Sequence, residues 1–171
     1  MSNLYLSFLG TSDYLECTYF LDTREVEGVR FIQEATISLN CKDWSSEDRI
    51  LIFTTNEAEE KNWCDSGHTE QREGLAKRLN RLNLKASIQH IKIPEGKTEE
   101  EIIKIFQILL DNIQPNDEII FDITHSFRSI PMLAIVVLNY AKVLKKVKLK
   151  GIYYGAFEVL GSPREAVEIP P

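Results

Sequence analysis

Apolar residues gather in short runs along the chain, separated by longer segments in which polar residues interrupt the pattern. Continuous apolar runs bounded by turn residues are typical of strands buried on both faces of a sheet. Such runs, together with one alternating segment, predict strands at 3–10, 48–56, 85–94, 117–124 and 149–159. A run rich in aromatic and β-branched residues predicts a further, less regular strand at 15–22.

Apolar residues at helical spacing mark the segments between these strands. They predict helices at 28–40, 66–83, 97–115 and 129–148. The first is ambiguous, since its last residues also suit a strand, but Gln33, Glu34 and Ala35 favour a helix. The third is the most clearly marked, because Thr98 and Glu101 have the spacing of a capping box.

The alternation of strands and helices predicts the fold class. Strands that are apolar on both faces and alternate with helices indicate an α/β domain with a mainly parallel sheet and helices on both faces. The chain has 171 residues, which fits a single domain.

The composition of the chain limits which molecules the protein is expected to bind. The chain has 20 Lys and Arg against 26 Asp and Glu, a formal charge of −6. This balance argues against direct DNA binding, which needs a broad basic face, but it allows a small anion in a local positive pocket. No apolar run approaches the roughly 20 residues of a membrane span, and the start lacks a basic signal-peptide segment. We expect a soluble cytoplasmic protein that does not contact a membrane.

Cysteine spacing and the known glycine motifs exclude several site classes. Cys17, Cys41 and Cys64 are widely spaced without a CxxC pair, so reduced thiols and no metal site are expected. The dinucleotide, P-loop and nucleophile-elbow glycine motifs are absent, which disfavours a nicotinamide or flavin enzyme, and no cofactor is expected. Asn62 and Trp63, beside a Glu-rich segment, are interpreted as a surface cap over the core.

Two polar loops follow predicted strands. In an open parallel sheet, ligands bind beyond the carboxyl ends of the strands. The first loop comprises Gly10, Thr11, Ser12, Asp13 and Tyr14. The second comprises Thr124, His125, Ser126, Phe127, Arg128 and Ser129.

The second loop has the chemistry of an anion site. It opens a helix, whose first N–H groups carry about half a positive charge and favour anions. Arg128 adds a planar fork suited to phosphate, and His125 can donate to a phosphate or a purine. The loop therefore predicts an anion or nucleotide pocket. An alternative stays open, in which the hydroxyls only cap the helix, Asp122 pairs with Arg128 and His125 is a satisfied, half-buried residue.

Three motifs resemble a known family. The segments FLGTSDY at 8–14, FTTNEAEEKNW at 53–63 and DITHSFRSIP at 122–131 are similar to the CRISPR-associated Rossmann-fold (CARF) family. The likeness is to the sensor half of the ancillary effectors of type III CRISPR systems. Ser126 departs from the pattern, because glycine is more usual there.

The resemblance implies a Rossmann-like homodimer that binds a cyclic oligoadenylate, the second messenger of these systems, through its ligand-binding face. A cyclic tetra- or hexa-adenylate would lie across the two-fold axis and control a downstream effector, a ribonuclease in antiviral defence. The implied ligand-binding residues are Gly10, Thr11, Ser12, Asp13, Tyr14, Thr124, His125, Ser126, Phe127, Arg128 and Ser129. Weaker candidates for lining the pocket or the dimer contact are Gly155, Ala156 and Phe157.

The resemblance leaves open whether the protein is an enzyme. Some members slowly cut their ligand without a metal, by attack of a ribose 2′-OH on the adjacent phosphate. The residues that would then act are Thr11, Ser12, His125 and Arg128. The Arg-x(four to six)-His motif of the usual ribonuclease effector is absent. We therefore expect residues 1–171 to be one CARF-like sensor domain cut from a longer protein with a C-terminal effector.

Overall fold

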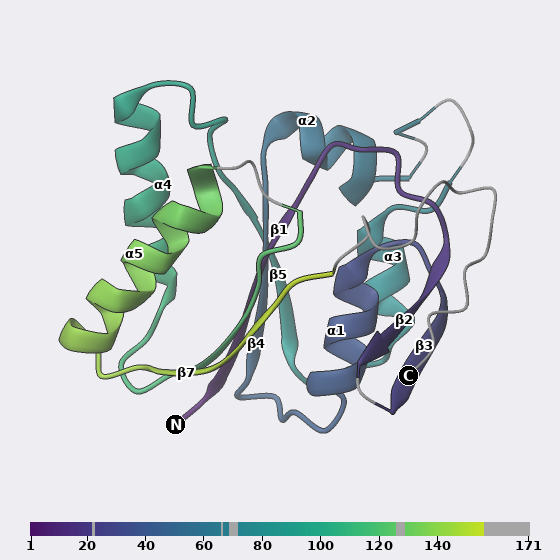
Figure 1. Ribbon diagram of the computed structural model, residues 1–171, viewed down its shortest axis with the longest axis horizontal. Coiled ribbons are helices and arrows are strands. Elements are labelled where there is room, and N and C mark those ends of the chain that lie inside the picture. The colour runs from purple at the N-terminus through teal and green to yellow at the C-terminus, as the bar shows by residue number, and fades with distance from the viewer. Residues whose placement is uncertain (22, 66, 69–71, 126–128, 156–171) are drawn as a thin grey trace.

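A computed structural model shows a five-stranded sheet in which every strand pair is parallel (Figure 1). The structure describes residues 1–21, 23–65, 67–68, 72–125 and 129–155, with the backbone alone for 129–131. The strands are β1 Asn3–Leu9, β4 Arg49–Thr54, β5 Ser87–Lys92, β6 Glu118–Asp122 and β7 Lys148–Tyr153. They stand in the order β5-β4-β1-β6-β7.

Helices cover both faces of this sheet. Figure 1 shows α4 and α5 on one side, and α1 and α3 on the other. Their bounds are α1 Ile32–Asn40, α3 Leu75–Asn80, α4 Glu99–Asn112 and α5 Ser129–Leu144. The predicted α/β, Rossmann-like class is confirmed.

The strands divide their side chains between two cores. Leu6 and Phe8 of β1 point to the core beneath α4 and α5, where Leu109 also lies. Tyr5 points the other way, into the core beneath α1 and α3, with Leu79. This period of two explains why the central strands β1, β4 and β6 are largely apolar on both faces, since both faces are buried there, whereas the edge strands β5 and β7 are partly exposed.

The order of the strands reverses between β1 and β6. From β1 the chain moves outward through β4 and β5 on one side, and returns to β6 and β7 on the other. Such a reversal separates the loops that leave two neighbouring strands, and ligands of open α/β sheets bind there. The two polar loops leave these two strands, at the top of the view in Figure 1.

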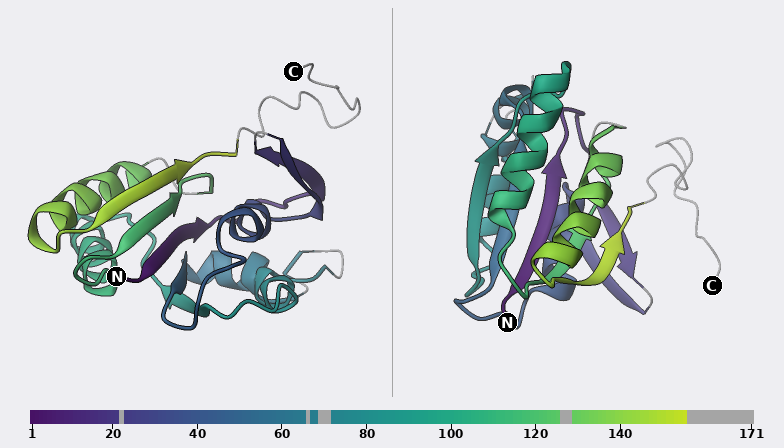
Figure 2. Two further views of the ribbon diagram at one scale, coloured as in Figure 1. Left: turned by 90° about the horizontal axis from the view of Figure 1, so that it is seen from below. Right: turned by 90° about the vertical axis from the view of Figure 1, so that its left-hand side faces the viewer.

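A hairpin stands apart from the main sheet (Figure 2). Its strands are β2 Cys17–Leu21 and β3 Arg24–Val29, which pair antiparallel. The strand predicted at 15–22 exists but lies outside the main sheet, and β3 was not predicted because most of its residues are exposed and polar. The helix predicted at 28–40 starts only at Ile32, since Val29 still belongs to β3 and Gly28 has a φ of +63°.

Two helical segments also differ from the prediction. Within the described part of 66–83, the helix covers only Leu75–Asn80. After β4, the short helix α2 Asn56–Ala58 runs into the π-helical turn η1 Glu59–Trp63, neither of which was predicted. With three and five residues, α2 and η1 are too short to show a helical apolar stripe.

The start of α4 carries half of the predicted capping box. Thr98 Oγ1 accepts from the Glu101 N–H at 3.2 Å, as expected. The Glu101 carboxylate, however, accepts from the Lys97 N–H at 2.7 Å rather than from that of Thr98. The acidic side chain therefore closes the helix start one residue earlier than a standard capping box would.

Candidate functional site

Asn62 holds the loop that follows β1. It lies in η1, is fully buried, and donates from Nδ2 to the carbonyl oxygens of Gly10 at 2.8 Å and Ser12 at 2.9 Å. Its Oδ1 lies 3.4 Å from Arg30 Nη2 and 3.1 Å from His68 Nε2. A π-helical turn shifts the side chains that follow it and is frequent at functional sites. Here the π-helical turn η1 directs the side-chain amide of Asn62 toward the loop that follows β1.

The two bonds to Asn62 fix the direction of the loop's own amides. In a trans peptide, the carbonyl of one residue points opposite to the N–H of the next. Because the carbonyls of Gly10 and Ser12 face Asn62, the following N–H groups, those of Thr11 and Asp13, point away from it. Within the described part of the chain, neither N–H has a hydrogen-bond acceptor. Two such amides suit an anionic oxygen.

The phenol of Tyr14 brings this loop against the end of β6. Its ring lies 4.1 Å from the His125 ring, measured between centroids, with an interplanar angle of 36°. Its hydroxyl lies so close to Gly10 that a Cβ at that position would overlap it, which explains the glycine. Burial raises the pKa of Tyr14 to about 12, so the phenol is neutral at physiological pH.

Three buried side chains of the described residues have a polar atom without a hydrogen-bond partner, and His125 is the one that lies in the two loops; the other two are Gln33 and Arg49. The Nε2 of His125 is buried and has no hydrogen-bond partner among the described residues. Burial lowers the pKa of His125 to about 4, so the ring is neutral at pH 7. A buried polar atom without a partner costs free energy. A ligand that supplies the partner would recover that cost.

Asp122, at the end of β6, points into the protein. It is fully buried, and its Oδ2 accepts from the hydroxyls of Tyr5 and Ser7, both at 3.1 Å. Its Oδ1 accepts from the Thr124 N–H at 3.0 Å and from Thr124 Oγ1 at 2.6 Å. Burial raises the pKa of Asp122, although these donors act against the rise. The carboxylate therefore fixes the start of the second loop through its two hydrogen bonds with Thr124.

Thr124 connects this carboxylate to the chain that leaves β7. Its hydroxyl donates to Asp122 and accepts from the Gly155 N–H at 2.8 Å. The single hydroxyl proton is therefore engaged within the protein. A bond from Thr124 to a ligand would have to come from another group of this residue.

The sequence matches the CARF domain of the CRISPR system endoribonuclease Csx1 over residues 4–158. That span includes both loops of the site and the strands on either side of β1. The chain belongs to the CARF family. The resemblance carried by the three motifs is thereby confirmed, and the protein is a CRISPR-associated sensor domain.

A curated relative is similar over part of this CARF domain. CRISPR-associated protein MJ1674 of Methanocaldococcus jannaschii is 48% identical over 71 residues. The match covers 40% of this chain and 11% of the relative. This match supports the CRISPR association. Because it covers so small a part of the relative, it says nothing about the activity of this chain.

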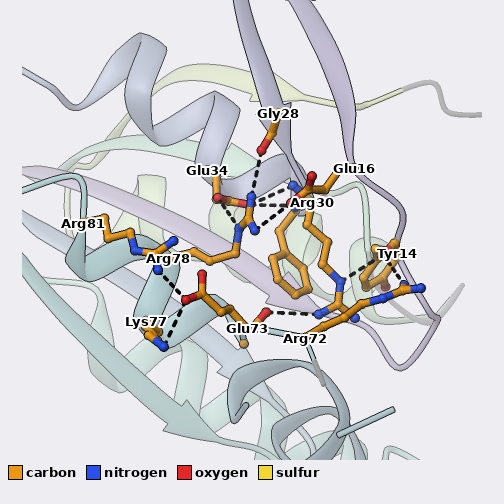
Figure 3. A network of polar contacts seen from close by, with 12 residues as sticks. Tyr14, Glu16, Gly28, Arg30, Glu34, Arg72, Glu73, Lys77, Arg78 and Arg81 are labelled. Carbon is orange, nitrogen blue, oxygen red and sulfur yellow. Dashed lines mark hydrogen bonds and ion pairs between the residues drawn. The ribbon is translucent and has the colours of Figure 1, made fainter. Parts of the chain in front are cut away.

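An arginine network braces the outer side of the first loop (Figure 3). Arg30 Nε donates to the Tyr14 carbonyl at 2.9 Å, and Arg72 Nη1 lies 2.8 Å from Asp13 Oδ1. Arg78 donates to the Gly28 carbonyl at 2.8 Å, which ties α3 to the hairpin. Arg30 and Arg72 therefore hold the first loop at Asp13 and Tyr14, whereas Arg78 holds the hairpin.

A second histidine lies near the carboxyl ends of β4 and β5. The His90 ring stacks on Trp63 at 4.5 Å between centroids and 18° between planes. Its Nε2 lies 2.5 Å from Thr54 Oγ1, and its Nδ1 lies 3.8 Å from Glu59 Oε1. Burial lowers the pKa of His90. The hydroxyl of Thr54 is fully buried, so the arrangement packs the core and offers no accessible nucleophile.

The described residues contain neither a membrane-spanning helix nor a metal-binding cluster. No helix among them is long and apolar enough to cross a membrane. No group of three or more His, Cys, Asp or Glu side chains among them is placed to hold a metal ion.

The structure places part of the predicted site. Gly10 to Tyr14 lie beside Thr124 and His125, at the carboxyl edge of the sheet, as the two-loop prediction requires. Ser129 begins α5. The remaining candidates, Ser126, Phe127, Arg128, Ala156 and Phe157, lie outside the described residues. Gly155 contacts Thr124 through the hydrogen bond given above.

Several residues of the site were missed. The interpretation of Asn62 as part of a surface cap is wrong, because its side chain is fully buried under the first loop. Arg30, between Val29 and Phe31, could have been noticed as a cation inside an apolar segment. Arg72 and Arg78 carry no such signal, because they read as ordinary charges on a predicted surface helix.

Proposed function

We propose that this CARF domain binds a cyclic oligoadenylate of four or six nucleotides as a homodimer, and thereby controls a downstream ribonuclease in type III CRISPR antiviral defence. The observation that carries the proposal is the meeting of the two loops above β1 and β6. There the outward N–H groups of Thr11 and Asp13 lie on the loop that contacts His125, whose Nε2 has no described partner.

The donors of the site suit a ring of phosphates on an acidic protein. A cyclic oligoadenylate carries one negative charge per nucleotide, and this chain has a net charge of −6. Neutral amides and a neutral histidine bind anions without a broad basic surface. The 16-residue helix α5 starts at the second loop, and its N-terminal amides add about half a positive charge.

The second copy in the proposed dimer would pack on α5. This helix buries one face against the sheet, through residues such as Val137 and Ala141. Its other face is also apolar and is exposed, through Met132, Ile135, Val136, Tyr140, Val143 and Leu144. Apolar patches of this kind normally mark a contact surface. The stripe begins beside the second loop, so a two-fold dimer on it would bring two copies of the site toward one symmetric ring.

Calorimetric titration with cyclic tetra-adenylate and, separately, cyclic hexa-adenylate tests the proposal. We expect tight binding of one ring at a stoichiometry of one per two chains, with sedimentation showing a dimer. Absence of heat with both rings at saturating concentration, in a folded protein, would overturn it.

Arg128→Ala sharpens this test. The loop chemistry and the family resemblance make Arg128 an expected phosphate contact, and loss of a charge-assisted hydrogen bond costs about 1.5–3 kcal/mol. We expect weaker binding of the ring by about ten- to a hundredfold. Lys142→Ala, which removes an exposed positive charge further along α5, is the matched control and should leave the affinity unchanged.

Slow cleavage of the bound ring is a second candidate function, favoured by His125. A neutral imidazole whose Nε2 is unpaired in the described structure can take a proton from a ribose 2′-OH. Thr11, Ser12 and Arg128 would then position the phosphate. Incubation of labelled cyclic tetra-adenylate with protein should yield linear product with a 2′,3′-cyclic phosphate end. An intact ring after many hours would exclude this activity and leave the sensor proposal standing.

A further inference from the structure

The π-helical turn η1, which holds the first loop through Asn62, is itself anchored on the edge strand β5. Glu59, the first residue of η1, forms an ion pair with Lys92, with 2.6 Å between Oε2 and Nζ. Trp63, the last residue of η1, stacks on His90. Along the chain, Asn62 therefore lies between two residues that are both tied to β5.

The two anchors on β5 leave the strand in the same direction. His90 and Lys92 are two residues apart in a strand, so their side chains lie on one face. His90 is held in turn by Thr54, the last residue of the neighbouring strand β4, whose hydroxyl is fully buried. The imidazole is therefore fixed from the sheet side, and the indole of Trp63 packs against a firm surface.

The stack is the stronger of the two anchors. Lys92 has a side chain that is 58% exposed, and an exposed ion pair contributes little because water screens it. The His90 side chain is 18% exposed, and its ring lies nearly parallel to that of Trp63. Aromatic contacts of this kind contribute through both burial and ring geometry. We therefore expect the position of η1 to depend mainly on the Trp63–His90 stack.

A short path of contacts leads from this stack to the donors of the first loop. Asn62 directly precedes Trp63 and bonds the carbonyls of Gly10 and Ser12, as described above. Hydrogen bonds weaken when they are stretched or bent, so a displacement of η1 reaches both carbonyls. Each carbonyl belongs to the same rigid peptide plane as the next N–H, so the donors of the loop turn with it.

We propose that His90 and Trp63 are positioning residues for the first loop, acting through η1 and Asn62 from the edge strand of the sheet. The stack sets the place of the Asn62 amide, and this amide sets the direction of the N–H groups of Thr11 and Asp13. The consequence for binding rests on the proposed function, whereas the consequence for the loop can be measured without a ligand.

His90→Ala, studied in the uniformly ¹⁵N-labelled chain without ligand, is the first test. We expect the amide signals of Thr11 and Asp13 to shift, together with the side-chain amide signals of Asn62. The affinity for cyclic tetra-adenylate should fall by about two- to thirtyfold, the range over which packed side chains couple distant positions.

Ile91→Ala is the matched control, because Ile91 is the next residue of β5 and packs on the opposite core, beneath α4 and α5. It should lower the free energy of unfolding without moving the Thr11 or Asp13 signals. Its affinity for the cyclic adenylate should equal that of the wild type.

His90→Phe gives a result that a merely stabilising contact would not. Phenylalanine keeps a planar ring against Trp63 but leaves the buried Thr54 hydroxyl without the imidazole. We expect a less stable protein whose loop signals and affinity are close to those of the wild type. Affinity that follows stability through His90→Ala, His90→Phe and Ile91→Ala would overturn the proposal.

Glu59→Gln keeps the proposal testable if His90→Ala does not fold. It weakens the other anchor of η1 and should shift the Thr11 and Asp13 signals by a smaller amount. Glu57→Gln is its control, because Glu57 pairs with Lys61 at the same 2.6 Å within the same segment and does not contact β5 in the described structure.

Loop signals that stay in place in the folded His90→Ala and Glu59→Gln variants would overturn the proposal, as would equal shifts in the two controls. A wild type that binds no cyclic adenylate would overturn the proposed function instead. The ligand-free spectra would still decide whether β5 positions the loop, so the two proposals can fail separately.

Discussion

The two faces of the sheet are built in different ways. Beneath α4 and α5 the core consists of aliphatic and phenyl side chains, such as Leu6, Leu109 and Phe121. Beneath α1 and α3 the sheet also carries a buried polar chain, in which Gln33 donates to Ser7 at 3.1 Å and Ser7 donates to Asp122 at 3.1 Å. Both polar partners on the sheet are fully buried.

This difference shows how the domain combines stability with a directional site. Apolar packing is strong but has no preferred direction, whereas hydrogen bonds fix orientation and contribute little net free energy. The polar face shapes the loops after β1 and β6 through Asn62 and Asp122. The apolar face supplies much of the stability and, on the outside of α5, the proposed dimer surface. Substitutions on the apolar face should therefore mainly lower stability, and substitutions on the polar face should mainly lower ligand affinity.

Leu109→Ala should give the largest effect on stability. Leu109 is 2% exposed in the apolar core, and truncation of a buried leucine costs about 2–5 kcal/mol. Urea denaturation would show the loss as a lower midpoint with an unchanged slope. Ligand affinity of the folded variant should stay within about twofold of the wild type, since no loop contact changes. A loss of affinity comparable to the loss of stability would contradict the division between faces.

Asn62→Asp should act mainly on binding. The change keeps the shape but replaces two donors with a carboxylate facing the carbonyl oxygens of Gly10 and Ser12. We expect a stability loss of about 1–3 kcal/mol, and a fall in ring affinity of at least about tenfold. Asn80→Asp, at an exposed position in α3, is the control for the added charge. Calorimetry on both variants checks the prediction, which fails if they bind equally well.

Asp122→Asn should have a smaller effect that depends on pH. The folded-state pKa of Asp122 is raised, so its stabilising contribution is full below the unfolded pKa and is lost as pH rises through the folded value. Asn resembles the protonated acid and does not titrate. The free energy of unfolding lost by the variant should therefore decrease from pH 4 to pH 7, measured by urea denaturation at each pH. An increase over this range would contradict the assignment.

His125 should produce no pH effect in the ordinary range. Its pKa of about 4 keeps the ring neutral above that value. The affinity for the cyclic adenylate should be constant from pH 5.5 to 8. It should rise only as protonation of His125 near pH 4 adds a positive charge. If ring cleavage occurs with His125 as base, its rate should likewise be flat above pH 5.5. A change of affinity or cleavage rate near pH 6.5 would mean that the His125 imidazole is exposed to solvent in the complex.

Much of the fold could be predicted because it depends on local periodicity. The buried strands at 48–56 and 117–124 and the helix at 97–115 have patterns that only one structure satisfies, and each was found. β3 was missed because Glu25 and Glu27 face solvent in a two-stranded hairpin, so no apolar run marks it. Pairing with β2, rather than composition, makes it a strand.

The site was only partly predictable, for a physical reason. Loops that leave neighbouring parallel strands meet at one edge, so the two polar loops could be placed together from sequence order and strand assignment. Contacts such as that between Asn62 and Gly10 join residues from elements whose packing the sequence does not show. The Glu101 carboxylate accepts from the N–H of Lys97 instead of that of Thr98, and the spacing of the residues does not determine which of the two donates.

The most direct measurement is an amide NMR titration of the uniformly ¹⁵N-labelled chain with cyclic tetra-adenylate. Binding at the loop amides predicts large shifts of the Thr11 and Asp13 signals. The amides of Asp117 and Lys148, bonded within the opposite edge of the sheet, should stay unchanged. Saturable binding that leaves the Thr11 and Asp13 signals in place would contradict the assignment of this loop as the phosphate contact.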